Sequence, residues 1–465
     1  MNKNNIIGAV LMAAVFIGYS IYSQPSAEEK AAAARQDSIE NVARKNAENA
    51  AKLAAQQKIA QAQAAAEADT TALFHSALKG KATNVVLKNS SVELTLNTKG
   101  GVVSKAVIKN FTDYNGNSNV TLFDSSSQSL NFALAAKEVN INTADLYFTP
   151  SNQTDSTVTM TATAGNGKEL VINYVLGSDY MLHAQLQTVG MAGDFAPSVS
   201  QMDVQWKEMC RQQERGFTFE NRYASLTYHK VDGGTDYLSE AKSITDENIE
   251  KKIDWVAFKN QFFSAVMIAK NNFAENSLMT SVPQEKGSGN LKQYEAKMKT
   301  FFDPSGKTPS EFDFYFGPND FRLLKRVEAE STFGKDLEMQ RLVYLGWPLF
   351  RIINRWFTIY VFDFLTGLNI NMGIVLILIT MLLKFITYPM VKKSYMSSAK
   401  MRVLKPKLEE ATKHLNKPED QMQKQQAMMA EYSKYGVSPL SGCLPMLIQM
   451  PIWIAMFNFV PNAIQ

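Results

Sequence analysis

The chain has 465 residues, a formal net charge of +4 and a mean hydropathy of -0.18. Its length exceeds that of one ordinary domain, and so small a net charge gives no reason to expect DNA as a partner. The two cysteines and four histidines show no metal-ligand spacing, and the chain has neither a phosphate-binding glycine loop nor a nucleophile elbow. We therefore expect no enzymatic activity, no catalytic residues, no cofactor and no metal.

An uncharged apolar run covers residues 6–22, close behind Lys3. Its length of about 17 residues is just enough for a helix to cross the hydrocarbon core of a membrane. A cleaved signal peptide and an uncleaved anchor both have this pattern, and the lack of a small-x-small cleavage site favours the anchor. We predict a transmembrane anchor over residues 1–24, followed at 25–83 by an Ala-rich spacer that is helical or disordered.

Apolar residues alternate with polar ones from about residue 84 to residue 316, for example in 92–96 and 170–176. A period of two predicts strands, and we expect a large antiparallel β-sandwich domain over residues 84–330. Asn166 and Gly167 stand between two such runs, which predicts a hairpin turn rather than a phosphate site. The aromatic segment 255–263 fits either a ligand groove or the core, and we expect the core.

The segment 346–365 is aromatic and apolar, and its spacing puts Arg351, Asn354, Arg355 and Thr358 on one face of a helix. Such a helix lies in the membrane interface rather than across it. We expect Arg351 and Arg355 to face the headgroups, with Trp356 among the aromatic residues of the same helix.

The clearest membrane span is the apolar run at residues 372–391. Six basic residues follow it, and the positive-inside rule assigns a short basic loop of this kind to the cytoplasm. These residues are Lys392, Lys393, Lys400, Arg402, Lys405 and Lys407. The span should therefore run from outside to inside.

Residues 392–437 have the pattern of a coiled-coil hairpin on the cytoplasmic side. One predicted seam is formed by Met401, Leu404, Leu408, Ala411 and Leu415, and the facing seam by Met422, Met429, Tyr432 and Tyr435. A last apolar segment at 442–462 then predicts another span, running from inside to outside. The resulting topology has the N-terminus in the cytoplasm, the β-domain outside and the hairpin inside.

Lys384 lies well inside the span at 372–391, about 18 Å from Met372 at ~1.5 Å per residue. A central lysine costs about 2.5 to 3.5 kcal/mol on insertion scales, so its side chain should face water or a partner. Snorkelling to the headgroups is the alternative. Thr380, one turn earlier, favours a polar stripe, although a lone Thr also bonds its own helix. Gln449 adds an amide in the next span, where an interhelical hydrogen bond is the alternative.

Several multi-residue motifs resemble the YidC/Oxa/Alb3 family of membrane protein insertases, Gram-negative type. The motifs are the Ile-Thr-Tyr-Pro-Met run at 386–390, the segment 396–401 and, most specifically, the segment 438–452. The resemblance covers residue 346 to the end. The turn at 97–101 and the segment around Trp255 also resemble the periplasmic domain of these proteins.

The resemblance implies a periplasmic β-supersandwich joined to a partial α-helical transmembrane bundle with a cytoplasmic helical hairpin, in the bacterial inner membrane. It implies an insertase without ATP hydrolysis, whose partners are nascent membrane proteins, the ribosome, the Sec translocon and the lipid bilayer. A hydrophilic groove would contain Lys384, Thr380, Gln449 and Trp453. The family commonly has arginine at the position of Lys384, and its five core spans imply that this chain is part of a longer insertase.

Two other classes of function remain open. In the first, a membrane-anchored periplasmic β-sandwich binds or processes glycans, which requires paired carboxylates or exposed aromatics converging on a cleft. In the second, a channel or transporter uses Lys384 as an ion site. The basic hairpin fits ribosomal RNA or anionic lipid, but a solvated cytoplasmic face fits at least as well.

Overall fold

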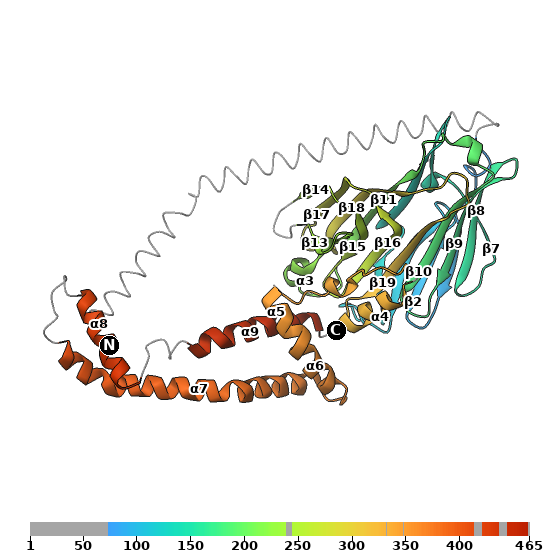
Figure 1. The fold of residues 1–465 in the computed structure, drawn as a ribbon. Helices are drawn as coiled ribbons and strands as arrows, with labels where there is room; N and C mark the ends of the chain where they lie inside the picture. Colours follow the sequence, from blue (N-terminus) through green and yellow to red (C-terminus); the bar gives the residue numbers. More distant parts are fainter. Residues whose placement is uncertain are drawn as a thin grey trace, which may run out of the picture. The chain divides into compact units, whose positions relative to one another are not determined.

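A computed structural model describes residues 73–238, 244–331, 333–346, 348–412, 421–436 and 444–463. The predicted anchor and most of the predicted spacer lie outside these residues. The chain divides into two compact units, Met1–Leu78 and Lys79–Gln465. All of the elements below belong to the second unit (Figure 1).

The β-domain is an antiparallel sandwich, as the alternation predicted. A four-stranded sheet has the order β1-β2-β3-β4, and its strands β3 and β4 contact strands of a second, 15-stranded sheet. The strands of the described part are β1 (Asn84–Lys88), β2 (Val92–Asn97), β3 (Val102–Lys109), β4 (Asn119–Phe123), β5 (Gln128–Ala135), β6 (Asn140–Asn142), β7 (Thr149–Ser151), β8 (Thr157–Gly165), β9 (Lys168–Leu176), β10 (Met181–Val189), β11 (Gln201–Arg211), β12 (Ser225–Lys230), β13 (Thr235–Tyr237), β14 (Thr245–Ile249), β15 (Ile253–Lys259), β16 (Phe263–Phe273), β17 (Ser277–Pro283), β18 (Asn290–Phe301) and β19 (Ser310–Pro318).

Alternating burial along the strands shows why this sequence folds as a sandwich. In β2, every second residue is buried, so one face meets the core and the other meets solvent. The hairpin turn between β8 and β9 is confirmed, since Gly165 pairs with Lys168, while Asn166 and Gly167 have φ values of 52° and 73°. Positive φ at both central residues is the geometry that Asn-Gly favours.

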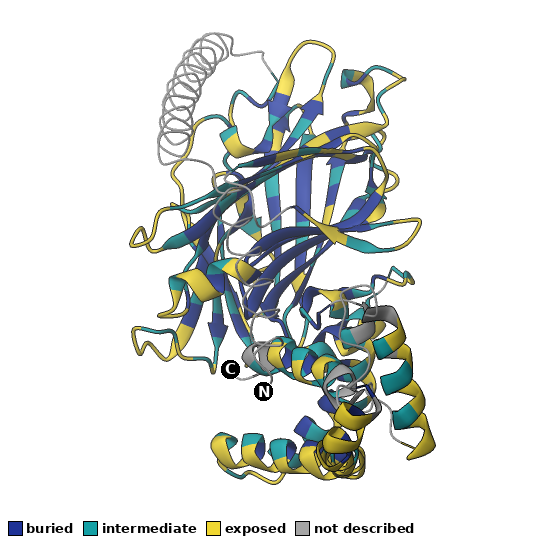
Figure 2. Cartoon of the chain, turned by 90° about the vertical axis from the view of Figure 1, so that its left-hand side faces the viewer, coloured by how far each residue is buried: buried dark blue, intermediate teal, exposed yellow. Residues whose placement is uncertain are grey.

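The aromatic segment 255–263 lies in the core, as we expected. Trp255, Phe258 and Phe263 are buried, and the ring of Phe258 stacks on that of Trp206 at a centroid distance of 4.0 Å. The Trp255 indole nitrogen donates a hydrogen bond to the Leu337 carbonyl at 2.7 Å. Figure 2 shows buried residues concentrated in the strands and exposed ones along the helices.

The helices of the described part are α3 (Phe217–Tyr223), α4 (Phe321–Glu330), α5 (Pro348–Ile353), α6 (Ile359–Thr366), α7 (Met372–Ala411), α8 (Gln421–Lys434) and α9 (Leu444–Ala463). Short 3-10 helices cover Thr143–Asp145, Ala192–Asp194 and Met339–Leu342, and a π-helical turn, Asn354–Thr358, joins α5 to α6. Asp320 caps α4 by accepting the Leu323 amide at 2.7 Å, and the buried Leu323 and Leu324 pack in one hydrophobic cluster with Tyr315 of β19.

In α7 the apolar run at 372–391 and the six basic residues belong to one continuous helix. The helix continues for 40 residues through Pro389, which is about 60 Å and twice the hydrocarbon thickness. Asn371 caps its start by accepting the Gly373 amide at 2.9 Å. A proline removes only one backbone bond, and residues 390–411 include no glycine, so the helix continues through Pro389 and Pro406 to Ala411.

Among the described residues, one helix is long and apolar enough to cross a membrane. It covers Met372–Glu410 and contains an 18-residue stretch with a mean hydropathy of 2.2, and Gln449–Val460 forms a shorter apolar helix. The multi-helix transmembrane bundle therefore stays a prediction.

Candidate functional site

The polar residues of α7 form a row along one side of the helix. Lys384 is exposed, and Thr380 is half-buried, with its hydroxyl donating to the Leu376 carbonyl at 2.8 Å. Thr387 extends the row by another turn and donates to the Leu383 carbonyl at 2.9 Å. Thr387 was not among the predicted groove residues, although its position seven residues after Thr380 predicts that both lie on the same side of a helix. Both hydroxyls bond their own helix, which was the alternative that we considered for Thr380.

On α9, Gln449 and Trp453 also lie one turn apart. Gln449 is half-buried and Trp453 is 45% exposed. No hydrogen bond between described residues joins either side chain to Thr380 or Lys384. The structure thus brings the four predicted groove residues onto two neighbouring helices, with no hydrogen bond between the two pairs in the described part of the chain.

α6, α7 and α9 pack together through apolar side chains. Val375, Ile379 and Leu383 of α7 are buried in the same cluster as Phe459 of α9 and Phe362 of α6. The rings of Phe362 and Phe459 meet edge to face with centroids 5.3 Å apart. The C-terminal half of α9 therefore lies beside the start of α7, and these two helices run antiparallel.

Residues 348–366 are helical, but their polar residues do not share one face. Asn354 and Thr358 are fully buried, whereas Arg355 is exposed and Arg351 is half-buried. The expectation of one headgroup face is wrong because the π-helical turn Asn354–Thr358 inserts an extra residue and changes the phase of the helix.

The exposed side of this helix instead carries a row of apolar residues, which we call the apolar stripe. Its members are Ile352, Trp356, Tyr360 and Phe364, each four residues after the last. Trp356 is the most exposed of them, at 72%. The four-residue spacing of these apolar side chains is visible in the sequence, but the sequence analysis used only the spacing of the polar residues.

α7 and α8 form the predicted hairpin with one change in its seam. Leu404 and Leu408 are buried against Met401, Met428 and Tyr432. Met428 takes the place expected for Met429, which is 62% exposed. Leu415 and the predicted turn at 416–418 lie outside the described residues. The six basic residues of α7 are all exposed, and Lys407 lies 3.2 Å from the Tyr435 hydroxyl.

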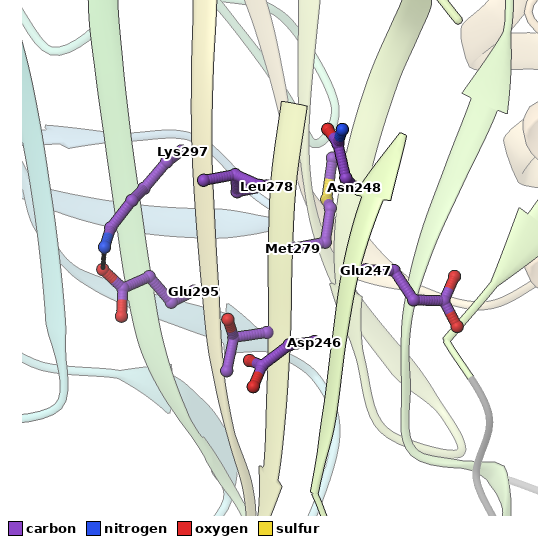
Figure 3. A pocket seen from close by; sticks show the side chains of 8 residues that line it. Asp246, Glu247, Asn248, Leu278, Met279, Glu295 and Lys297 are labelled. Carbon is purple, nitrogen blue, oxygen red and sulfur yellow. Dashed lines mark ion pairs between the residues drawn. The ribbon is translucent and has the colours of Figure 1, made fainter. Parts of the chain in front are cut away.

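Among the described residues, shallow cavities of about 540 and 320 Å³ lie on the larger sheet of the β-domain, and both are lined by Leu278 and Lys297. In the smaller one, shown in Figure 3, Glu295 and Lys297 form an ion pair at 3.4 Å. Their lining residues include no aromatic side chain. Of the two features that a glycan site can use, exposed aromatics are thus missing from these two cavities, whereas the carboxylates of Asp246, Glu247 and Glu295 line the smaller one.

A β-sandwich joined to a long apolar helix and a basic helical hairpin defines a class, the membrane-associated proteins with a large extramembranous β-domain. Comparison with known proteins refines this class. A family model described as the YidC periplasmic domain matches residues 84–360, and one described as the 60Kd inner membrane protein matches residues 364–465. The chain belongs to the YidC family of membrane protein insertases, and it is an inner-membrane protein with a periplasmic domain.

The similarity to curated relatives extends over the whole chain. Membrane protein insertase YidC of Phocaeicola vulgatus is 49% identical over 469 residues, and that of Bacteroides fragilis is 44% identical over 467 residues. Each alignment covers 100% of this chain and 74% of the relative. The insertase of Porphyromonas gingivalis is 33% identical over 475 residues, with 75% of its length covered.

Similarity to solved structures is lower. An active YidC insertase crystal structure with its first transmembrane domain resolved is 18% identical, with a TM-score of 0.28 over 84% of this chain and 75% of that chain. A galactose mutarotase related enzyme from Lactobacillus acidophilus is 10% identical, with a TM-score of 0.33 over 50% of this chain and 97% of that chain. At such TM-scores neither likeness carries an argument.

Proposed function

We propose that this chain inserts nascent membrane proteins through a polar groove beside the contact between α7 and α9. The groove contains Thr380, Lys384, Gln449 and Trp453. It admits the short polar tail of a substrate, which shortens the apolar barrier that the tail must cross. The apolar segment of the substrate then passes into lipid, driven by the burial of apolar surface. No covalent bond is made or broken.

The observation that carries this proposal is the direction of the two polar rows. Thr380 and Lys384 each follow a buried residue of α7 by one position, or about 100° around the axis. Trp453 likewise follows Ile452, which packs on the same cluster. Because α9 runs antiparallel to α7, equal rotations away from the contact turn both rows to the same side of the helix pair.

The charge of Lys384 supports a hydrated groove. Its side chain is exposed and has no ion-pair partner within the described part of the chain. Exposure to lipid at this depth costs about 2.5 to 3.5 kcal/mol, whereas exposure to a wet groove avoids that cost. A lysine there attracts the acidic groups of a substrate tail. Because lysine lacks the planar fork of arginine, it acts as a point charge.

The proposed topology has the start of α7 and the end of α9 at the periplasmic side. Both lie beside the chain segment that leaves the β-domain, and the basic face of α7 begins about 30 Å further along the helix. That distance matches the hydrocarbon thickness of a bilayer. The apolar stripe then lies in the interface, with Trp356 at headgroup level.

The hairpin of α7 and α8 supplies a cytoplasmic docking surface in this proposal. Its six basic residues fit phosphates of ribosomal RNA or of anionic lipid, and substrates arrive from the ribosome or the Sec translocon. Salt sensitivity of ribosome binding is the corresponding signature.

A photo-crosslinking residue at Thr380 tests the groove. Ribosomes stalled while making a small membrane protein are bound to native membranes, and the nascent chain should crosslink to Thr380. The control has the same residue at Phe385, which is 79% exposed and lies on another side of α7. Equal yields at both positions, or no crosslink at Thr380, would contradict a groove on one side of the helix pair.

A further inference from the structure

One buried amide joins three separate segments of the membrane part. The Asn354 side chain is fully buried, and its Nδ2 donates to the Leu345 carbonyl at 3.1 Å and to the Ala455 carbonyl at 2.9 Å. Leu345 belongs to the connection from the β-domain, Asn354 to the interfacial helix and Ala455 to α9. We call this contact the Asn354 joint.

The π-helical turn explains why Asn354 points inward. Asn354 opens this turn, and its carbonyl accepts the amide of Ile359 five residues later. A turn of this kind adds one residue to the helical cycle and is frequent at functional sites. The shift turns Asn354 toward α9, while the neighbouring Arg355 stays exposed.

The helices approach closely at the joint. Ala455 is fully buried, and the small side chain lets the Asn354 amide reach the backbone of α9. Gly346 has a φ of +84°, and a Cβ added there would lie 2.7 Å from the Asn458 side-chain nitrogen. A larger residue at Gly346 would therefore displace the Asn458 side chain of α9.

The Asn354 amide is only half satisfied. Its Oδ1 is buried and has no hydrogen-bond partner among the described residues. A buried polar atom without a partner is unfavourable in a folded protein, so its presence calls for a reason. An apolar side chain would avoid this cost but would remove the one donor shared by the two carbonyls.

The position of the joint connects it to the groove. Trp453 lies two residues before Ala455 on α9, and Gln449 lies six residues before it, about 9 Å along the axis. A helix this short transmits a tilt at Ala455 directly to both side chains. We propose that Asn354 is a positioning residue for insertion, an inference that rests on the proposed groove. Asn354 fixes the tilt of α9 and thereby the distance of Gln449 from Lys384.

Asn354→Asp tests this role because it keeps the shape of the side chain and removes the NH₂ donor. The full-length protein in native membranes carries Thr380→Cys and Gln449→Cys, and a bismaleimide reagent measures how close the two positions are. Asn354→Asp removes both hydrogen bonds, and the crosslink should fall about fivefold, the change expected for the loss of the one bond that holds α9 at Ala455. Nascent-chain crosslinking at Gln449 should fall with it.

Asn319→Asp is the matched control. Asn319 is also buried, and its Nδ2 also donates to two backbone carbonyls, those of Asn260 and Gln261, but within the β-domain. This variant should leave the cysteine crosslink unchanged even if it lowers the melting temperature. Asn354→Ser, which keeps a hydroxyl donor, should retain part of the crosslink and covers the case in which Asn354→Asp does not accumulate.

An unchanged cysteine crosslink in both Asn354 variants would overturn the positioning role. So would a fall that merely follows the amount of folded protein and appears equally in Asn319→Asp. A different result would separate the two proposals. If the cysteine crosslink falls in Asn354→Asp, but no nascent chain crosslinks to Gln449 even when Asn354 is unchanged, the positioning role of Asn354 is supported and the proposed groove is contradicted.

Discussion

The guanidinium of Arg322 on α4 lies 2.6 Å from the Oδ2 atom of Asp363 on α6. The same guanidinium lies over the ring of Tyr360, 5.8 Å from its centroid. α4 packs on the β-domain, and α6 packs in one hydrophobic cluster with α7 and α9. This ion pair therefore joins the β-domain to a helix that packs on the two helices of the proposed groove.

Breaking this pair should loosen the two parts without unfolding either. Arg322 is 59% exposed, so we expect Arg322→Ala to cost at most about 1 kcal/mol. The connection at residues 333–346 should become more sensitive to protease, and the charge swap Arg322→Asp with Asp363→Arg should restore resistance. Lys270→Ala, which breaks an ion pair of 2.7 Å within the β-domain, is the control and should leave the cleavage rate of the connection unchanged.

Glu220 should make the stability of the β-domain depend on pH. Burial raises the pKa of Glu220 from 4.5 to about 7, although its carboxylate accepts the Gln213 and Glu214 amides. The folded state therefore holds a proton that the unfolded state releases first. The stabilising contribution is complete below pH 4.5 and is lost as the pH rises to about 7, by a total on the order of 3 kcal/mol.

Fluorescence of the buried Trp206 and Trp255 can follow unfolding from pH 5 to 8, and Glu220→Gln should flatten the curve. Glu295→Gln is the control. Hydrogen bonding to Gln205 and the nearby lysines lower the pKa of Glu295 despite its burial, so its contribution is lost only as the pH falls below 4.5. A slope that survives in Glu220→Gln would refute the assignment.

Lys384 should select substrates by the charge of their tails. Lys384→Ala removes the attraction for acidic groups, and we expect insertion of an acidic-tailed substrate to slow by about tenfold, as for the loss of one charge interaction of ~1.4 kcal/mol. Lys384→Arg keeps the charge and should insert an acidic-tailed and a neutral-tailed substrate at the normal rate. Protease protection of the tail in vesicles measures the rate, and equal slowing of a neutral-tailed substrate would show that the charge is not the cause.

The stack of Trp206 on Phe258 should be a main support of the sandwich. Trp206→Ala removes a fully buried ring and should cost about 3 to 5 kcal/mol in free energy of unfolding. Val175→Ala, on the exposed face of β9, should cost less than about 0.5 kcal/mol. Urea denaturation compares the two, and a cost below ~2 kcal/mol for Trp206→Ala would mean that the core collapses around the gap.

Local sequence signals predicted the elements well where one pattern dominates. Alternation at 92–96 and the Asn166-Gly167 pair each specify their structure within a few residues. The pairing order of the 15-stranded sheet was not predictable, because partners such as β11 and β18 lie far apart in the chain.

Two of the predictions that were wrong differ from the structure by one residue in the phase of a helix. The π-helical turn buries Asn354 and Thr358, which an ideal helix would group with Arg355. The same kind of error exchanged Met429 for Met428 in the hairpin seam. The sequence also treated the run at 372–391 and the hairpin at 392–437 as separate segments, whereas α7 passes through Pro389 without a break.

Because α7 is one continuous helix, the proposed groove and the basic residues lie at opposite ends of the same element. No glycine lies between Gly373 and the end of the helix at Ala411, so the rod has few points at which to absorb a movement. Pro389 and Pro406 each lack a backbone donor, so these are the points at which the helix bends most easily. Pro389 stands between Lys384 and the six basic residues, and it therefore limits how far a movement of the basic end is passed to the polar row.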